Sequence, residues 1–440
     1  MIKYLGSKRT LLPLIARVAG ALPNAESVTD LFSGTARVGH ALKQHGFRVT
    51  SNDHNAYAAT LARCYVEADR EDIESDARKL IAEFNSLPGR AGYFTETFCE
   101  RSRFFQPKNG ARVDAIREAI SSKCLPPDLE SVLLVSLMEA ADRVDSTCGV
   151  QMAYLKQWAA RANNDIELRL PEVVARPSSG KCRALQADAL DAVKSVESDI
   201  LYLDPPYNQH SYLGNYHVWE SLILWDKPEV YGIACKRVDC RERKSDFNLK
   251  PKFWPAFTQI IRSARARLIV VSFNNEGYAS REQMEALLSE RGDVFVLATD
   301  YKRYVGAQIG IYNPSGNLVG QVSHLRNLEY IYIVDTQKSG VDWADIVARL
   351  SDAAPVQKSH SRPTSVSEVG SLLHERGRLT NQDVQTALGV EAQAARLALK
   401  HLVEAGDATM EGARRGAVYV STRLPKSAEQ PSQIDQMRLF

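Results

Sequence analysis

The sequence predicts a doubly wound α/β domain with a helical insertion, followed by a small winged-helix domain. Short apolar runs typical of buried strands occur at 27–32, 47–51, 200–203, 268–273, 294–298 and 330–334. A helical pattern begins at about Arg37, between the first two runs, and this strand–turn–helix–strand order implies a parallel sheet. Three short helical patterns and a hairpin pattern follow residue 366, which is the order of a helix-turn-helix with a wing.

These patterns predict four segments along the chain. The α/β domain takes residues 1–335, interrupted by the helical insertion at about 95–170. The last two strand runs bracket Gly306–Gly316, which we expect to be the tip of a β-hairpin. A polar stretch places a linker at 336–365, and the remaining segments are a winged-helix domain at 366–422 and a mobile tail at 423–440.

The composition is that of an ordinary soluble globular protein, with 44% apolar and 25% charged residues. A net charge of +2 neither requires nor excludes a nucleic-acid partner, because binding depends on where the charge lies. The seven cysteines form no CxxC pair and no Cys/His cluster, so we expect no metal site. The sequence shows neither a signal peptide nor a run of about 20 apolar residues, which predicts a cytoplasmic protein without membrane contact.

The strongest chemical signal is the tetrad Asp204-Pro205-Pro206-Tyr207, directly after an apolar strand. Open α/β folds bind ligands at this edge of the sheet. An aromatic amino group is a poor nucleophile because its lone pair is delocalised into the ring. The Asp204 carboxylate and a carbonyl aimed by the fixed φ of Pro205 can accept both N–H bonds and free that lone pair. Tyr207 can stack on the base, worth about 1–3 kcal/mol. The alternative is a loop in which two prolines end a strand.

A second signal is the segment Asp30–Gly39, which again ends a strand and opens a helix. Its small residues allow a ligand to approach the backbone, and a helix N-terminus favours a carboxylate or phosphate. Asp53 ends the next strand, 53 − 30 = 23 residues later. An acid about 20 residues on binds the ribose hydroxyls in nucleotide-binding βαβ units. A third segment, Lys3–Arg9, is a basic turn that by composition alone is a solvated chain end.

In order and spacing, these segments resemble the Dam-type (alpha-group) adenine-N6 DNA methyltransferases over residues 1–335, about three quarters of the chain. Ser272–Asn275 and Asn327–Tyr330 also match the family pattern. The resemblance implies an S-adenosylmethionine-dependent methyltransferase fold with Asp204–Tyr207 as the catalytic tetrad. It assigns Asp53 to the cofactor ribose and Asp188 to the cofactor adenine. The full set of implied cofactor-binding residues is Tyr4, Lys8, Asp30, Phe32, Gly34, Asp53 and Asp188.

The resemblance also implies a function: site-specific methylation of an adenine flipped out of double-stranded DNA, by a bacterial or phage-type enzyme associated with the nucleoid. An aspartate at the head of the tetrad favours adenine over cytosine. Ala36 stands where the family usually has a second glycine, which leaves the backbone approach at this loop open. Three alternatives remain: an enzyme acting on an amino nitrogen of RNA, one acting on protein, and a DNA-binding regulator with a relict catalytic fold.

Two segments combine basic and aromatic residues, as phosphate contact and base stacking require, although both could be core-facing helices. They are Arg101, Arg103, Phe104, Phe105, Lys108, Asn109 and Arg112, and then His210, Tyr212, Asn215, Tyr216, His217 and Trp219. In the winged-helix pattern, the candidate DNA contacts are Gln393, Arg396, Lys400 and the wing pair Arg414-Arg415. Such a domain also serves as a dimerisation or partner module, so a homodimer is one option.

Overall fold

The computed structural model describes residues 1–6, 8–302, 311–312, 318–320, 326–353, 366–388, 392–412 and 417–422. The chain divides into two compact units, Met1–Ser351 and Asp352–Phe440. The predicted hairpin tip at Gly306–Gly316 lies mostly outside the described residues. Most of the linker's second half and all of the tail at 423–440 also lie outside them.

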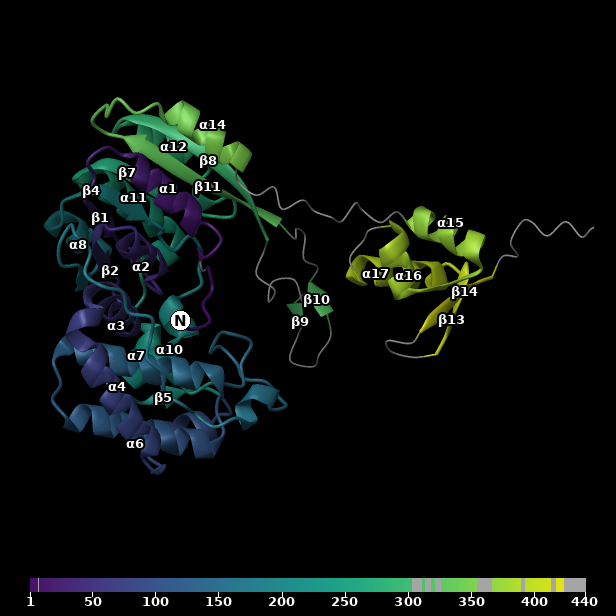
Figure 1. Cartoon of the computed structure of the whole chain (residues 1–440), viewed down its shortest axis with the longest axis horizontal. Coiled ribbons are helices and arrows are strands. Elements are labelled where there is room, and N and C mark those ends of the chain that lie inside the picture. Colours follow the sequence, from purple (N-terminus) through teal and green to yellow (C-terminus); the bar gives the residue numbers. More distant parts are fainter. Residues whose placement is uncertain are drawn as a thin grey trace, which may run out of the picture. The chain divides into compact units, whose positions relative to one another are not determined.

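A seven-stranded sheet in the order β3-β2-β1-β4-β7-β11-β8 forms the centre of the first unit (Figure 1). Its strands are β1 (Ser27–Asp30), β2 (Arg48–Asn52), β3 (Arg183–Leu185), β4 (Ser198–Leu203), β7 (Ala266–Asn274), β8 (Asp293–Lys302) and β11 (Arg326–Asp335). The first five strands in spatial order are parallel, and β11 runs antiparallel to both β7 and β8. The six predicted strands are confirmed, and the short edge strand β3 was missed.

Alternate side chains of the central strands enter two separate cores, which is the doubly wound arrangement. In β4, Ile200 and Tyr202 belong to one core, while Leu201 and Leu203 belong to the other. The helices with residues in the first core include α1 (Leu12–Ala21), α2 (Arg37–Gln44) and α14 (Trp343–Ala353). Those of the second core are α8 (Ala189–Ser195), α11 (Lys250–Ser263) and α12 (Arg281–Ser289). A mixed α/β fold with a mostly parallel sheet is therefore confirmed.

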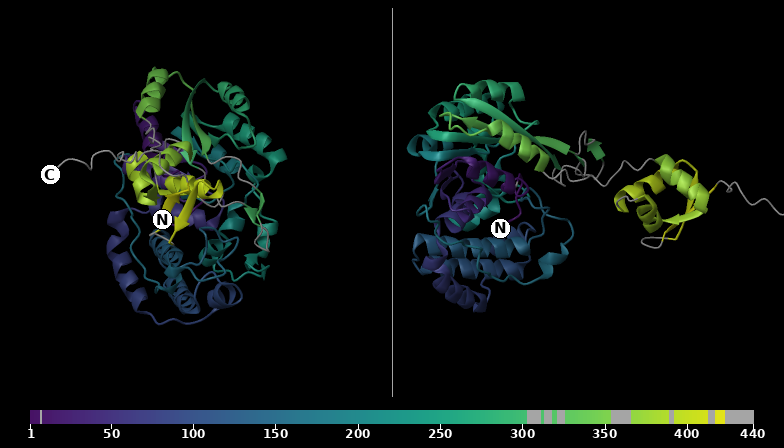
Figure 2. Two further views of the ribbon diagram at one scale, coloured as in Figure 1. Left: turned by 90° about the vertical axis from the view of Figure 1, so that its right-hand side faces the viewer. Right: turned by 45° about the horizontal axis from the view of Figure 1, so that its top comes forward.

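The helical insertion begins earlier than the predicted residue 95. Its helices are α3 (Ala56–Ala62), α4 (Arg70–Ser86), α5 (Tyr93–Thr95), α6 (Pro107–Ser122) and α7 (Pro127–Arg143), and they gather on one side of the sheet (Figures 1 and 2). From Val144 to Cys182 the chain is mostly loop. The short helices α9 (Tyr212–Asn215) and α10 (His217–Leu224) and the hairpin strands β5 (Val230–Tyr231) and β6 (Lys236–Arg237) follow the tetrad.

The first unit extends past residue 335, where the linker was predicted to begin. Helix α14 packs on this unit because Trp343 is 1% exposed and Leu350 joins the first core. The indole Nε1–H of Trp343 also donates to Asp335 Oδ2 at 3.0 Å. The sequence signal for α14 is an apolar pattern in the first half of the stretch 336–365. The polar second half of that stretch favours a linker.

The second unit has its own apolar core, centred on Val369, Leu373 and Leu399. Its helices are α15 (Val366–Arg376), α16 (Asn381–Leu388) and α17 (Ala392–Glu404), and its three-stranded sheet has the order β12-β14-β13. The strands are β12 (Arg378–Thr380), β13 (Ala408–Glu411) and β14 (Val418–Ser421). In the first unit, two further short strands, β9 (Ile311–Tyr312) and β10 (Leu318–Gly320), pair with each other.

A chain truncated after Ala353 should fold with nearly the thermal stability of the first unit in the full protein, because the two units have separate cores. A chain truncated after Asp335 loses Trp343 and Leu350. Removing a buried tryptophan side chain alone costs about 3–5 kcal/mol. Thermal unfolding followed by circular dichroism compares the two truncations. Equal melting temperatures would show that α14 does not stabilise this unit.

Candidate active site

The strand register brings three predicted acidic residues to one edge of the sheet. Asp30, the last residue of β1, pairs with Ser51 on one side and with Tyr202 on the other. Asp53 and Asp204 each follow two residues beyond those partners, so all three emerge at the carboxyl edge of neighbouring strands. This edge is where open parallel sheets bind their ligands.

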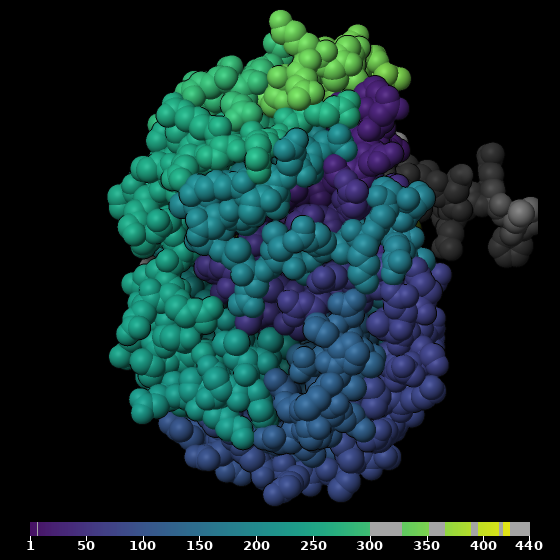
Figure 3. Space-filling model, turned by 90° about the vertical axis from the view of Figure 1, so that its left-hand side faces the viewer, coloured from purple at the N-terminus to yellow at the C-terminus, as the bar shows by residue number. Residues whose placement is uncertain are grey.

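A cleft with about 950 Å³ of empty space, part of it open to solvent, lies at this edge. All seven predicted cofactor-binding residues line it, and so do Asp204 and Pro206 of the tetrad. Pro205 is buried, and Tyr207 packs edge-on with Phe273 at 5.9 Å between ring centres; neither lines the cleft. Figure 3 shows a face of the first unit on which the purple N-terminal segments lie between the blue helices and the green segments.

The loop between β1 and α2 has a backbone that favours glycine at two positions. Gly34 has φ +51°, and the Tyr4 hydroxyl lies 3.3 Å from where a β-carbon on Gly34 would stand. Ala36, which replaces the usual family glycine, also adopts a left-handed φ of 59° and is fully buried. A left-handed backbone costs a residue other than glycine about 1–2 kcal/mol. The loop therefore keeps the glycine-type turn, with alanine in a strained conformation.

A stack of tyrosines holds the N-terminal segment against the cleft. The Tyr4 ring lies between Tyr212 and Tyr216, with ring centres 5.2 and 4.7 Å away and planes within 12° of parallel. The Tyr4 hydroxyl is 3.3 Å from that of Tyr57, and the backbone N–H of Leu5 donates to Tyr216 Oη at 2.7 Å. The basic N-terminal turn is thus part of the site and not a solvated end.

Asp30 and Asp53 are carboxylates whose environment suits a positively charged ligand. Asp30 is 1% exposed; its Oδ2 accepts the Gly39 N–H at 3.2 Å, and its Oδ1 has no hydrogen-bond partner. Burial and, secondly, the nearby Asp204 charge raise the pKa of Asp30 to about 8. Asp53 accepts the Gly34 N–H at 3.1 Å and the Asn55 N–H at 2.9 Å, and burial raises its pKa. A cationic group in the cleft would favour the ionised form of both carboxyl groups.

Lys8 connects Asp204 of the tetrad to Glu329 of β11. Its Nζ lies 3.2 Å from Asp204 Oδ1 and also pairs with Glu329 Oε1, which accepts the Ser272 hydroxyl at 2.8 Å. Although burial disfavours its charge, Asp204 and Glu329 raise the pKa of Lys8. Burial raises the pKa of Asp204 to about 6; Lys8 opposes this rise and Glu329 adds to it. One buried ammonium is therefore shared between two carboxylates.

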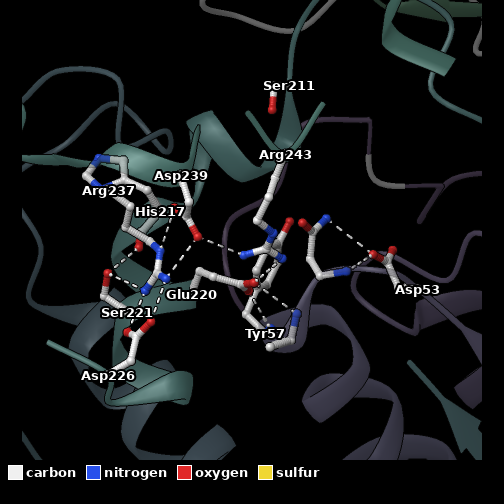
Figure 4. Close-up of polar contacts among 12 residues, drawn as sticks. Asp53, Tyr57, Ser211, His217, Glu220, Ser221, Asp226, Arg237, Asp239 and Arg243 are labelled. Atoms are coloured by element: carbon white, nitrogen blue, oxygen red, sulfur yellow. Dashed lines mark hydrogen bonds and ion pairs between the residues drawn. The ribbon is translucent and has the colours of Figure 1, made fainter. Parts of the chain in front are cut away.

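Sequence reasoning missed two charged residues beside the cleft, Glu220 and Arg243. Glu220 is fully buried in α10, and its two oxygens accept the backbone N–H groups of Ala56 and Tyr57 at 3.2 and 2.9 Å. Arg243 lines the cleft and donates to Glu220 at 2.9 Å and to Asp239 at 3.2 Å (Figure 4). The available signal was a single acid within the apolar run of α10.

The two basic–aromatic segments expected to contact DNA bury most of their aromatic side chains. Phe104 and Phe105 are core residues, so the first segment is largely structural. In the second, Trp219 is also in the core. His217 is fully buried beside the Gln151 carbonyl at 2.9 Å, and burial lowers its pKa to about 3. Both segments therefore pack chiefly as the core-facing helices that the sequence left open.

Asp188, predicted to contact the cofactor adenine, is the N-cap of α8. Its Oδ1 accepts the Leu190 N–H at 2.8 Å, and the residue lines the cleft. In the part of the chain that the structure describes, no group of three or more His, Cys, Asp or Glu side chains is placed to hold a metal ion. No described helix is long and apolar enough to cross a membrane.

The sheet is mostly parallel, a carboxylate-lined cleft lies at its edge, and the tetrad directly follows β4 at this edge. These features together define an S-adenosylmethionine-dependent methyltransferase of amino groups. Residues 4–286 match the family of D12 class N6 adenine-specific DNA methyltransferases. The chain belongs to this family, whose methyl donor is S-adenosylmethionine.

Three curated proteins illustrate the similarity. The chain is 31% identical over 337 residues to the type II methyltransferase M.NlaIII of Neisseria lactamica, covering 74% of this chain and 98% of that protein. It is 32% identical over 310 residues to the type II methyltransferase M.FokI of Planomicrobium okeanokoites, covering 66% and 47%. It is 30% identical over 325 residues to the modification methylase StsI of Streptococcus sanguinis, covering 69% and 49%. The chain spans about half of the last two proteins.

Asp53→Ala should weaken cofactor binding by about 10- to 100-fold, because a charge-assisted hydrogen bond contributes about 1.5–3 kcal/mol. Asp53→Asn keeps one oxygen acceptor and should lose less. Calorimetric titration with S-adenosylhomocysteine measures both. If Asp53→Ala binds as tightly as the wild type, another group holds the ribose.

The pH dependence of turnover should move in opposite directions when the two partners of Asp204 are removed. An ionised Asp204 is a stronger acceptor of N–H bonds than a protonated one, so activity should fall as the pH drops through about 6. Lys8→Met removes the cation that lowers this pKa, so the acid limb should move to higher pH. Glu329→Gln removes a like charge, so the limb should move to lower pH. Single-turnover rates from pH 5 to 8 test this, and shifts of the same sign would contradict it.

Proposed function

We propose that this protein is a site-specific modification enzyme of the Dam-type subgroup, which transfers a methyl group from S-adenosylmethionine to N6 of an adenine flipped out of duplex DNA. The observation that carries the proposal is the position of Asp204. Its carboxylate opens on the same cleft as Asp30 and Asp53 and is paired with the buried Lys8 ammonium.

The residues of the cleft fit the cofactor chemically. S-adenosylmethionine supplies a methyl group activated by a sulfonium, and it also carries an ammonium, a carboxylate, a ribose and an adenine. The unpartnered Oδ1 of Asp30 suits the ammonium end. Asp53 suits the ribose hydroxyls and Asp188 the adenine amino group. Phe32 is an apolar wall, and Tyr4 with Gly34 shapes the loop that the cofactor approaches.

The tetrad prepares the target nitrogen. Asp204 accepts one N6–H bond and the Pro205 carbonyl accepts the other, which draws the nitrogen lone pair out of the ring. Bound S-adenosylmethionine would supply the methyl group and leave as the neutral thioether, and the Asp204 carboxylate, already hydrogen-bonded to the nitrogen, would take up the extra proton. Lys8 keeps Asp204 ionised and fixes the carboxylate, and Pro206 lines the cleft.

The second unit is proposed as a winged-helix domain that assists DNA binding. Arg396 and Lys400 are exposed on α17, the expected recognition helix. Nothing is described of the Gln393 side chain, and Arg414 and Arg415 lie outside the described residues. Dimerisation through this unit is the competing role.

The helical segment of about 95–170 is proposed to contribute to target recognition. The enzyme is proposed to act in the cytoplasm at the nucleoid.

Family membership favours DNA adenine over the RNA and protein alternatives. The complete set of carboxylates around the cleft argues against a relict regulator, because buried unpaired charges are costly to keep without a ligand. The names of the relatives, type II methyltransferases and modification methylases, support a role in a restriction–modification system.

Asp204→Ala should reduce methyl transfer by about 100- to 1,000-fold or more, while cofactor affinity stays within a few-fold, because Asp204 acts on the target nitrogen. Asp191→Ala, an exposed carboxylate on α8, is the matched control and should keep full activity. Sequencing of modified bases in DNA from cells expressing each variant identifies the methylated site. Full N6-methyladenine in the Asp204→Ala cells would refute the assignment of the tetrad.

A further inference from the structure

The most exposed large apolar side chain of the described residues is Ile233, at 79%. It lies in the turn of the hairpin between β5 and β6, beyond the tetrad in the chain. Met152, at 48% exposed, belongs to the neighbouring loop, because Lys236 Nζ lies 2.9 Å from its Sδ. Isolated exposed apolar residues are common, so the surroundings of these two decide whether they form a site.

The base of this hairpin is fixed in place. Arg237 in β6 is 3% exposed and pairs through its two terminal nitrogens with both oxygens of Asp226, each at 2.7 Å. It also binds both oxygens of Asp239 at 3.0 Å. Two bidentate pairs on one guanidinium hold the strand rigidly (Figure 4). Ile233 is therefore presented outward by an anchored β-ribbon.

Three cations without a carboxylate partner among the described residues lie on the hairpin, just after it, or on the Met152 loop: Lys236, Arg241 and Lys156. The Arg241 guanidinium carbon lies 3.9 Å from the centre of the Tyr231 ring, which orients it. Segments 148–161 and 230–237 contain no Asp or Glu. The nearby carboxylates of Asp226 and Asp239 are already paired with Arg237. Ile233 and Met152 are thus accompanied by three cations and, directly before β5, by one exposed carboxylate, Glu229.

Hydrogen bonds connect the segments that carry this surface to the active site. Gln151, next to Met152, accepts the Val218 N–H on its side chain and donates its own N–H to the Asn215 carbonyl, at 2.9 and 2.8 Å. On the other side, Asp239 joins Arg237 of the hairpin to Arg243, which lines the cleft. The hairpin is therefore joined to a residue of the cleft wall through Asp239 and Arg243.

We propose that this surface, made of Ile233, Met152, Lys156, Lys236 and Arg241, is the DNA contact that drives base flipping. In this proposal the Ile233 side chain inserts between base pairs. The proposal rests on the proposed function. β-Ribbons enter DNA grooves, and apolar wedges unstack neighbouring bases at a cost repaid by wider contact. The three cations contact phosphates and seat the duplex.

The experiment uses the full chain and a short duplex with the site mapped by base sequencing, carrying 2-aminopurine at the target adenine. Ile233→Ala should lower the fluorescence gain on binding and reduce kcat/KM for DNA at least tenfold, with KM for S-adenosylmethionine unchanged. Ile233→Met keeps an apolar tip and should restore both. Because Ile233 is exposed, neither change should affect folding.

Binding across a salt series tests the cations separately. Lys236→Gln and Arg241→Gln should each lower the slope of log K against log salt by about 0.9, the value for one lost phosphate contact. Lys79→Gln, an exposed lysine on α4 with the same charge change, should leave the slope intact. Wild-type flipping and turnover in Ile233→Ala, or unchanged slopes in both cation variants, would overturn the proposal. Failure of the wild type to methylate DNA would instead refute the proposed function.

Discussion

The site depends on one buried ammonium. Lys8 comes from the N-terminal turn, Asp204 from the end of β4 and Glu329 from β11, and a single charge holds the three together. Taking charges out of water costs several kcal/mol each unless they are paired. This arrangement keeps Asp204 ionised near neutral pH and fixes its direction. Without Lys8, two carboxylates would face each other in a poorly solvated space.

Two further carboxyl groups of the cleft, those of Asp30 and Asp53, also lie in buried surroundings. Asp30 retains an unpartnered oxygen, and the carboxylate of Asp53 secures the turn at Gly34. These negative groups have too few cations of their own, so the cleft is prepared for a positively charged ligand. S-adenosylmethionine carries its reactive charge on sulfur and has no pyrophosphate. A glycine loop of the kind that binds a pyrophosphate is therefore not needed. The strained backbone of Ala36 suggests that loop shape matters more here than local stability.

A second chain of charges links the cofactor side to the proposed DNA side. Glu220 caps the start of α3, directly after the Asp53 segment, and pairs with Arg243. Arg243 and Arg237 share Asp239, and Arg237 anchors the hairpin that carries Ile233. Ion pairs therefore connect the hairpin to the helix that follows the Asp53 segment.

The sequence by itself determined the six main strands, because apolar runs are local patterns, and the family resemblance singled out seven residues that line the cleft. Tertiary structure alone decided that Phe104, His217 and Trp219 are buried, because interleaved charges and aromatics suit a core edge as well as a DNA surface. It alone attached α14 to the first unit and paired Lys8 with Glu329. Those two residues are 321 positions apart, and only strand order and register bring such distant charges together.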